Sequence, residues 1–382
     1  MLKNRCYLDF NATTPLLNNV KESMIAALDV YGNPSSVHQE GRMAKAAIQD
    51  ARRKVASLVN ASPDNVIFTS GASESAHFAL TPYYQMGRSD LRISHLYYNS
   101  TEHPCILNGG QFSASERTSI PVQKNGLLNL EDLKQKLNAH DISKGIPLVA
   151  VQAANPETGV IQPLKEIATI TREAGGLMVV DLVQYVGKMP IDIKQDVGDF
   201  FIYSAHKIGG PKGVGAFISA SDIIMPKPLL RAGGQEKGHR GGTEAFILIV
   251  GFGEAAKNTV DAYNQESHLK QLQEKLELGI EKNVPDVIIY GKDAPRLPNT
   301  TYFTVPNIPA ETMQISFDLA GFAVSAGSAC SSGKTTLSPV LKAMGFEHND
   351  GALRVSTGVS TTLEDIDRFL EELEKLVNRR KK

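Results

Sequence analysis

The sequence predicts an α/β protein, in which a large domain with a mostly parallel central sheet flanked by helices precedes a smaller α+β domain. Between about residues 14 and 256, short apolar runs closed by glycine or polar residues alternate with helical patterns. Buried parallel strands separated by helices produce this alternation. After Ala255 a charged helix and shorter strands follow. We therefore place the large domain at 14–256 and the small domain at 257–382, completed by the N-terminal segment 1–13.

The large domain should open with two helices. Thr14 and Pro15 precede apolar residues at helical spacing, which predicts a capped helix with proline at its first position. A second helix is expected through 44–59, where charged residues occupy the other face. Further helices are expected at 130–139 and 163–174. Strands are expected within 65–71, 93–98, 147–152, 177–181, 199–207 and 213–218.

The small domain should begin with a charged helix over 266–282, followed by strands within 286–291 and 299–305. Thr361 and Glu364 have the spacing of a capping box, which predicts the start of a last amphipathic helix. The sequence shows no internal repeat and no low-complexity linker. We therefore expect the two domains to pack closely.

Composition narrows the classes of function. The 382 residues carry a formal net charge of −1, which gives no reason to expect nucleic acid or an anionic membrane as a partner. The three cysteines lie far apart, so we expect no disulfide framework and a reducing compartment. The opening MLKNRCYLDF has no apolar signal core, and no apolar run is long enough to span a membrane. We expect a cytoplasmic protein, although an organelle protein without its leader would look the same.

Ligands of open α/β sheets bind in loops at the carboxyl ends of strands, and polar residues gather there in this chain. In TSGASESAHF, 69–78, a turn of small residues opens a helix whose N–H groups and hydroxyls suit a phosphate. Asp181 ends a strand, where a buried carboxylate needs a positive partner, and Gln184 follows it. An ordinary turn and a capping aspartate are the plain alternatives.

A second group of polar residues follows another apolar strand, where Ser204, His206 and Lys207 enter a glycine-rich loop. Partial desolvation and the neighbouring histidine would lower the pKa of the lysine toward its nucleophilic form. A solvent-exposed lysine is the plain alternative. The loop 231–246 is rich in glycine and charge, and Thr243 would cap the next helix and suit a phosphate. A surface loop is its plain alternative.

Together these features describe a cofactor with an aldehyde, a phosphate and a ring nitrogen, which is pyridoxal 5'-phosphate (PLP). The sequence has no His/Cys metal spacing and no nucleotide-binding glycine motif, so neither a metal nor a nucleotide is expected. Cys330 lies among small residues in VSAGSACSSGK. That setting suits neither a core residue nor a disulfide.

Nine motifs resemble those of the cysteine desulfurases, which are fold-type I, class V aminotransferase-like PLP enzymes. They run in the family's order from about residue 6 to 372: YLDFNATTP, YGNPSSVHQEGR, FTSGASES, TEHPCIL, NPETGVIQP, VVDLVQYVGKMPIDI, YSAHKIGGPKGVG, GGQEKGHRGGTE and SAGSACSSGK. The resemblance implies an enzyme that takes sulfur from L-cysteine, releases L-alanine and leaves a persulfide on Cys330. A selenocysteine or cystine lyase, an aminotransferase and a non-catalytic scaffold are the alternatives.

The resemblance also implies roles for residues around the cofactor. Lys207 would bind PLP covalently, and Asp181 would pair with the ring nitrogen. Gln184 would hydrogen-bond the ring oxygen, while His103 would stack on the ring and help to move protons. The phosphate would be held by Ala72, Ser73, Ser204 and His206, with Thr243 reaching over from the second subunit of a homodimer.

On the substrate side, the resemblance implies that Arg354 clamps the carboxylate of L-cysteine in a bidentate pair and that Asn33 also binds substrate. Pro156 stands where many relatives carry an asparagine that contacts the ring oxygen, and Asn155 is the candidate to replace it. Ser73 stands where threonine is common. The long stretch after Cys330 resembles group I enzymes, whose loop carries sulfur to a protein. The expected acceptor is an iron–sulfur scaffold, or a sulfur carrier for tRNA thiolation or cofactor synthesis.

Overall fold

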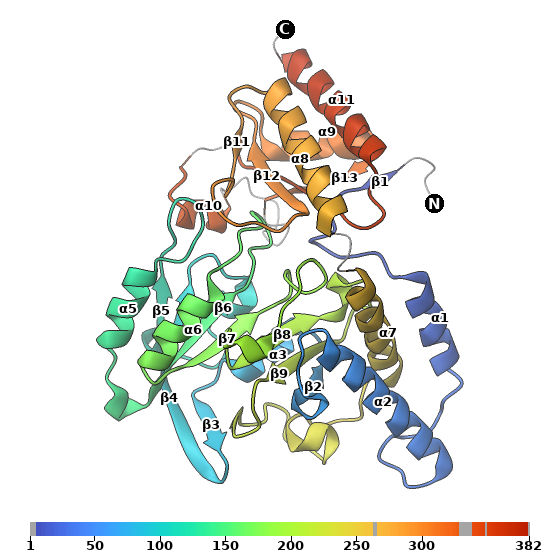
Figure 1. The fold of residues 1–382 in the computed structure, drawn as a ribbon, viewed down its shortest axis with the longest axis vertical. Coiled ribbons are helices and arrows are strands. Elements are labelled where there is room, and N and C mark those ends of the chain that lie inside the picture. Colours follow the sequence, from blue (N-terminus) through green and yellow to red (C-terminus); the bar gives the residue numbers. More distant parts are fainter. Residues whose placement is uncertain (1–4, 263–265, 328–337, 348–349, 381–382) are drawn as a thin grey trace.

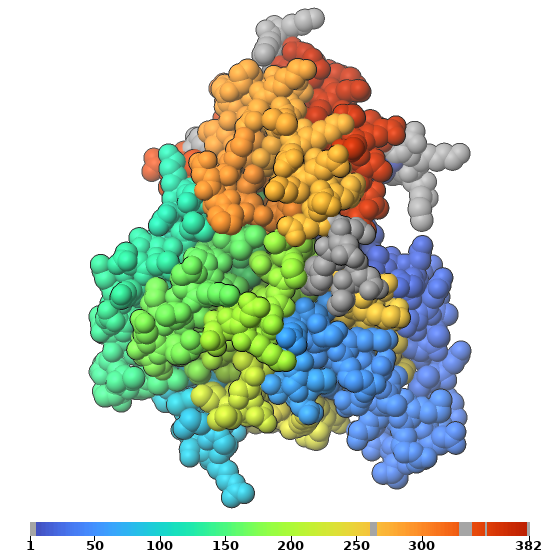
Figure 2. Space-filling model, viewed as in Figure 1, coloured from blue at the N-terminus to red at the C-terminus, as the bar shows by residue number. Residues whose placement is uncertain are grey.

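The computed structural model describes residues 5–262, 266–327, 338–347 and 350–380. The chain forms a large part built on one wide sheet and a small part that follows it in sequence (Figure 1). Figure 2 shows the small part, coloured mostly orange to red, seated on the large part. Among the described residues, no helix is both long and apolar enough to cross a bilayer.

The central sheet is mixed but mostly parallel, because all its strands except β3 and β9 run in one direction. Its order is β10 (Ile224–Pro226), β3 (Tyr83–Met86), β4 (Ser89–Asn99), β6 (Ile146–Gln152), β7 (Leu177–Asp181), β8 (Phe200–Ser204), β9 (Gly215–Ser219) and β2 (Val66–Thr69), with β5 (Arg117–Ile120) pairing with β4. The central strands β6, β7 and β8 are almost wholly buried, as expected for parallel strands covered on both faces.

Helices cover both faces of this sheet. Their bounds are α1 (Asn18–Ala27), α2 (Gln39–Ser57), α3 (Ala72–Ala79), α4 (Pro104–Leu107), α5 (Leu130–Asn138), α6 (Leu164–Glu173) and α7 (Phe246–Ala262). Successive side chains of a strand point to opposite faces. Accordingly Val180 of β7 packs in one core cluster with α2, α5, α6 and α7, whereas its neighbour Val179 packs in another with α3.

The small part contains α8 (Glu266–Asn283), β11 (Ile288–Ile289), β12 (Thr300–Thr304), α9 (Ala310–Leu319), β13 (Phe322–Ala323), β14 (Ser325–Ala326), α10 (Pro339–Ala343), β15 (Leu353–Ser356) and α11 (Leu363–Arg380). Its antiparallel sheet has the order β11-β12-β15-β14. The N-terminal strand β1 (Cys6–Tyr7) pairs in parallel with β13. Leu8 joins the core cluster of this part, so the N-terminal segment packs with the small part.

Several boundaries differ from the sequence expectation for local reasons. The first helix begins at Asn18, because Thr14 hydrogen-bonds two carbonyls elsewhere: its N–H donates to His206 O at 2.9 Å and its hydroxyl to Lys207 O at 2.8 Å. The capping box before α11 is formed one residue later than predicted, by Thr362 and Asp365. The prediction that Thr243 caps a helix was wrong, since α7 begins only at Phe246.

Candidate active site

A cavity of about 710 Å³ lies where the strands of the central sheet end and the small part begins. Loops after β2, β4, β6, β7 and β8 border the cavity on the side of the large part, and β15 of the small part contributes Arg354. This is where open α/β sheets bind ligands. The expected site residues that line it are Ala72, Ser73, His103, Asp181, Gln184, Ser204, His206, Lys207 and Arg354.

Lys207 lies in a short helical turn directly after β8. Its Nζ donates to Asn11 O at 2.5 Å and to Ala12 O at 2.9 Å. Two backbone carbonyls of the N-terminal segment therefore hold the amine beside the cavity. Neither carbonyl could be identified from the pattern around Lys207, because they lie almost two hundred residues earlier in the chain.

Asp181 ends β7, and its Oδ1 accepts the Val183 N–H at 2.8 Å. Burial raises the pKa of Asp181 to about 6, while the Val183 N–H and the charge of Lys207 pull it down. A carboxylate in such a position is stabilised by a cationic partner. A protonated ring nitrogen would supply that charge.

The carboxyl of Glu102 and the imidazole of His103 line the same cavity as Asp181. The buried Glu102 accepts the Gln152 N–H at 2.6 Å through Oε1, and its Oε2 has no partner among the described residues. Burial, and secondarily Asp181, raises the pKa of Glu102 well above its usual range. Burial, with Lys207 nearby, lowers the pKa of His103.

The tautomer of His103 follows from its neighbours. The backbone N–H of Cys105 donates to His103 Nδ1 at 3.3 Å, and the Cys105 sulfur lies 3.1 Å from the same nitrogen. Burial raises the pKa of Cys105 well above its usual range, so its thiol keeps its proton. Because Nδ1 accepts, the neutral imidazole carries its proton on Nε2.

Gln184 is oriented by a buried lysine. Its Nε2 donates to Asn11 O at 3.0 Å, and its Oε1 accepts from Lys188 Nζ at 2.8 Å. Lys188 lies wholly inside the protein, where burial, together with Lys207 and Arg354, lowers its pKa well below the usual value. The sequence analysis did not identify Lys188, since a lysine seven residues after a strand end carries no signal of burial.

The end of the cavity near α3 has the chemistry of an anion site. Gly71 precedes the helix with a φ of +156°, and an added Cβ there would meet nothing within 4 Å. Ala72 and Ser73 form the first turn, while His206 and Lys212 bring basic groups. Burial and both neighbouring lysines lower the pKa of His206 to about 4, so it serves as a neutral hydrogen-bonding group.

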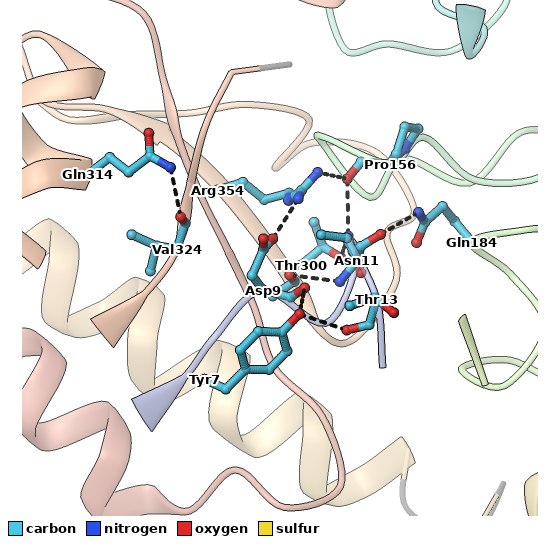
Figure 3. A network of polar contacts seen from close by, with 12 residues as sticks. Tyr7, Asp9, Asn11, Thr13, Pro156, Gln184, Thr300, Gln314, Val324 and Arg354 are labelled. Atoms are coloured by element: carbon cyan, nitrogen blue, oxygen red, sulfur yellow. Dashed lines mark hydrogen bonds and ion pairs between the residues drawn. The ribbon is translucent and has the colours of Figure 1, made fainter. Parts of the chain in front are cut away.

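Arg354 enters the cavity from β15 (Figure 3). Its Nη1 donates to Pro156 O at 3.1 Å and its Nη2 to Asp9 Oδ1 at 2.6 Å. Asn11 Nδ2 also donates to Pro156 O, at 3.1 Å. The proline at position 156 thus supplies a carbonyl acceptor to the network.

The remaining expected residues are not brought into this cavity. Asn155 is buried and lies outside its lining: its Oδ1 accepts from Glu157 N and Thr158 N at 2.9 Å each, and its Nδ2 donates to Thr101 O at 3.1 Å. Those bonds occupy the amide that was expected to replace the missing asparagine. Thr243 and Asn33 are exposed and likewise do not line the cavity. Cys330 lies outside the described residues.

Within the described ranges, no group of three or more His, Cys, Asp or Glu side chains could hold a metal ion. The donor set instead fits PLP: a lysine amine, a buried carboxylate, a neutral histidine and an amide surround one cavity, with a helix start and hydroxyls at one end.

The model of the class-V aminotransferases matches residues 6–369, and the chain belongs to this family of PLP-dependent enzymes. Cysteine desulfurase IscS 1 of Archaeoglobus fulgidus is 36% identical over 380 residues, 98% of this chain and 97% of the relative. Cysteine desulfurase IscS of Dictyoglomus turgidum is 34% identical, over 99% of this chain and 96% of its own length. The structure of a NifS-like protein from Rickettsia africae matches with a TM-score of 0.87 and 34% identity, covering 98% of this chain and all of that one.

Within the class-V family, the chain therefore groups with the cysteine desulfurases of the IscS and NifS type. A further solved structure, SspA in complex with cysteine, matches with a TM-score of 0.74 and 29% identity, covering 92% of this chain and 98% of that one. The fold of the present chain is accordingly that of NifS-like PLP enzymes.

Proposed function

We propose that the protein is a PLP-dependent L-cysteine desulfurase that releases L-alanine and transfers the substrate sulfur to Cys330. The full-length likeness to cysteine desulfurases supports the reaction class. The observation that carries the assignment is the gathering of Lys207, Asp181 and His103 in one cavity, with Arg354 entering from the other part of the chain.

The cofactor would be held by residues with separate tasks. Lys207 would bind it covalently, Asp181 would face its ring nitrogen, and Gln184 and His103 would contact the ring. Ala72, Ser73, Ser204 and His206 would hold its phosphate. When bound, PLP withdraws electrons from the substrate α-carbon and so eases removal of its proton.

The chain's own groups would handle the protons. Lys207 Nζ, once free, would take the proton from the substrate α-carbon, and the resulting ammonium would be stabilised by the carbonyls of Asn11 and Ala12. His103 would present its Nε2–H as a proton donor, because Nδ1 is occupied by Cys105. Arg354 would pair with the substrate carboxylate.

The sulfur transfer would proceed at Cys330. Its thiolate sulfur would form a bond to the substrate sulfur as the substrate Cβ–S bond breaks. The carbon side would keep the electron pair and then take up a proton to give L-alanine. The Cys330 persulfide would pass its outer sulfur to an acceptor protein, either an iron–sulfur scaffold or a sulfur carrier.

The working enzyme would be a cytoplasmic homodimer. Between α1 and α2, the side chains of Tyr31 and Val37 leave 84% and 88% of their surface exposed, and a partner could cover them. Asn33 lies in the same loop, and Thr243 is also exposed. A second subunit packed here would bury these side chains and bring Thr243 of one subunit toward the cofactor phosphate of the other.

Mass spectrometry after incubation with L-cysteine tests the function directly. The wild type should form alanine and carry extra sulfur on Cys330. Cys330→Ala should abolish sulfide release in the presence of a reductant, and Lys207→Ala should lose the covalent attachment of PLP. If Cys330→Ala releases sulfide at the wild-type rate, the protein is instead a lyase that does not use this thiol, such as a selenocysteine or cystine lyase.

A further inference from the structure

The Asp9 carboxylate contacts the Arg354 guanidinium from outside the cavity. Among the described residues, Arg354 and Pro156 border the cavity but Asp9 does not. The Asp9 carboxylate nevertheless accepts a hydrogen bond from Arg354 Nη2 at 2.6 Å, as Figure 3 shows. The carboxylate is therefore placed to hold the arginine without occupying the space that a substrate needs.

The position of Asp9 is itself fixed by backbone pairing. Asp9 forms a parallel bridge with Ser356, two residues beyond Arg354. Leu8 O accepts the Ser356 N–H at 2.9 Å, and the Phe10 N–H donates to Ser356 O at 3.2 Å. These bonds join the N-terminal segment to β15, so the spacing between Asp9 and Arg354 is set by main-chain geometry.

Two nitrogens of the guanidinium are thus held, Nη2 by Asp9 and Nη1 by the Pro156 carbonyl. Because a guanidinium is planar, fixing two nitrogens fixes the direction of its other N–H groups. Arg354 Nε is buried and has no hydrogen-bond partner in the described part of the chain. Nη1 and Nη2 each keep a second N–H beside the bonds to Pro156 and Asp9, and these are the groups left for a substrate carboxylate.

We propose that Asp9 is a positioning residue for substrate binding, which orients Arg354 so that its remaining N–H groups meet the substrate carboxylate. This inference rests on the proposed function in one respect, namely that Arg354 binds that carboxylate. Asp9 supplies orientation through a hydrogen bond. An amide oxygen in its place can accept the same bond, whereas a methyl group cannot.

The test uses two ligands that differ only by the carboxylate, L-alanine and ethylamine. Their dissociation constants are measured on the PLP-loaded enzyme from the change in cofactor absorption, and the KM and kcat for L-cysteine are measured alongside. The variants are Asp9→Ala, Asp9→Asn, Arg354→Met and the double variant Asp9→Ala/Arg354→Met. Asp318→Ala is the matched control, because Asp318 pairs with Arg5 of the same segment in an exposed ion pair.

Asp9→Ala should weaken L-alanine binding about tenfold or more and ethylamine binding less than about twofold. The KM for L-cysteine should rise in parallel, with kcat within about threefold of wild type. The reason is that the variant loses an interaction made equally with the bound substrate and with the transition state. Asp9→Asn and Asp318→Ala should stay within about threefold. On the Arg354→Met background, Asp9→Ala should cause no further loss, because the two residues act through one contact.

Equal losses of L-alanine and ethylamine in Asp9→Ala would overturn the inference, as would no loss, or additive losses in the double variant. An Asp9→Asn enzyme as weak as Asp9→Ala would overturn it too, because charge and not orientation would then be the contribution of Asp9. Failure of the proposed function has a different signature. Wild-type enzyme would then form no alanine from L-cysteine, while the comparison of the two ligands would still report on Asp9.

Discussion

Replacing Glu236 with alanine should destabilise the large domain by about 3–5 kcal/mol, the usual cost of removing one partner of a buried ion pair. Arg52 Nη1 and Nη2 each lie 2.7 Å from a carboxylate oxygen of Glu236, and the two side chains are only 7% and 2% exposed. Glu236 also accepts the Phe68 N–H at 2.8 Å. After truncation, Arg52 would keep only the Val66 carbonyl as a described acceptor, at 2.6 Å.

Urea unfolding followed by circular dichroism measures this loss, with an unchanged slope showing that the denatured state is the same. Lys237→Ala is the matched control: Lys237 follows Glu236 and pairs with Asp64, but these side chains are 55% and 81% exposed. That variant should lose at most about 1 kcal/mol. If Glu236→Ala loses no more than Lys237→Ala, the buried pair is not what anchors this loop, and the reasoning is refuted.

Three further variants test other parts of the molecule. Asp181 should lower the stability of the apoprotein by about 3 kcal/mol as the pH rises from about 4 to about 6. Burial raises the pKa of Asp181 to about 6, so the native state keeps a proton that the unfolded chain has already lost. Asp181→Asn should abolish this loss. Thermal unfolding of the wild type and of Asp181→Asn across this pH range gives the difference in stability. Burial lowers the pKa of His206 to about 4, which has the opposite effect on stability, but this effect is the same in both proteins and cancels in the difference. Lys188→Met should weaken PLP binding about tenfold in a titration of the apoprotein without lowering the unfolding free energy, because it removes the 2.8 Å bond to Gln184; unchanged affinity would contradict this role. Phe317→Ala should cost about 3–5 kcal/mol in urea unfolding, since it empties a stacked aromatic site in the small part; a loss below about 1 kcal/mol would show that the site collapses.

The sequence was most informative where a side chain directly follows a strand. The run ending at Asp181 was predicted as a strand over 177–181, and β7 has these bounds. Lys207 follows β8 as expected. Parallel strands bring such residues to one edge of the sheet, so local patterns suffice to predict that they meet.

Contacts that depend on long-range register were not predictable in this way. Asp9 and Asn11 reach the site only because the N-terminal segment pairs with β13 and β15. Asn155 was misplaced for the opposite reason: its amide is consumed by hydrogen bonds within its own turn, a use that asparagine side chains commonly find. Lys188 and Glu102 look like surface residues in the sequence, and only the packed structure reveals their burial.

The contact between Asp9 and Arg354 joins residues 345 positions apart, and this separation has a consequence for biosynthesis. At typical translation rates, about 20–70 s pass between the synthesis of the first residue and that of the second. During this time the nascent large domain can form its sheet, but the carboxylate that orients Arg354 has no partner. The Asp9–Arg354 contact therefore forms only after residue 354 has been made, and a site in which Arg354 binds substrate, as proposed above, would be complete only near the end of synthesis.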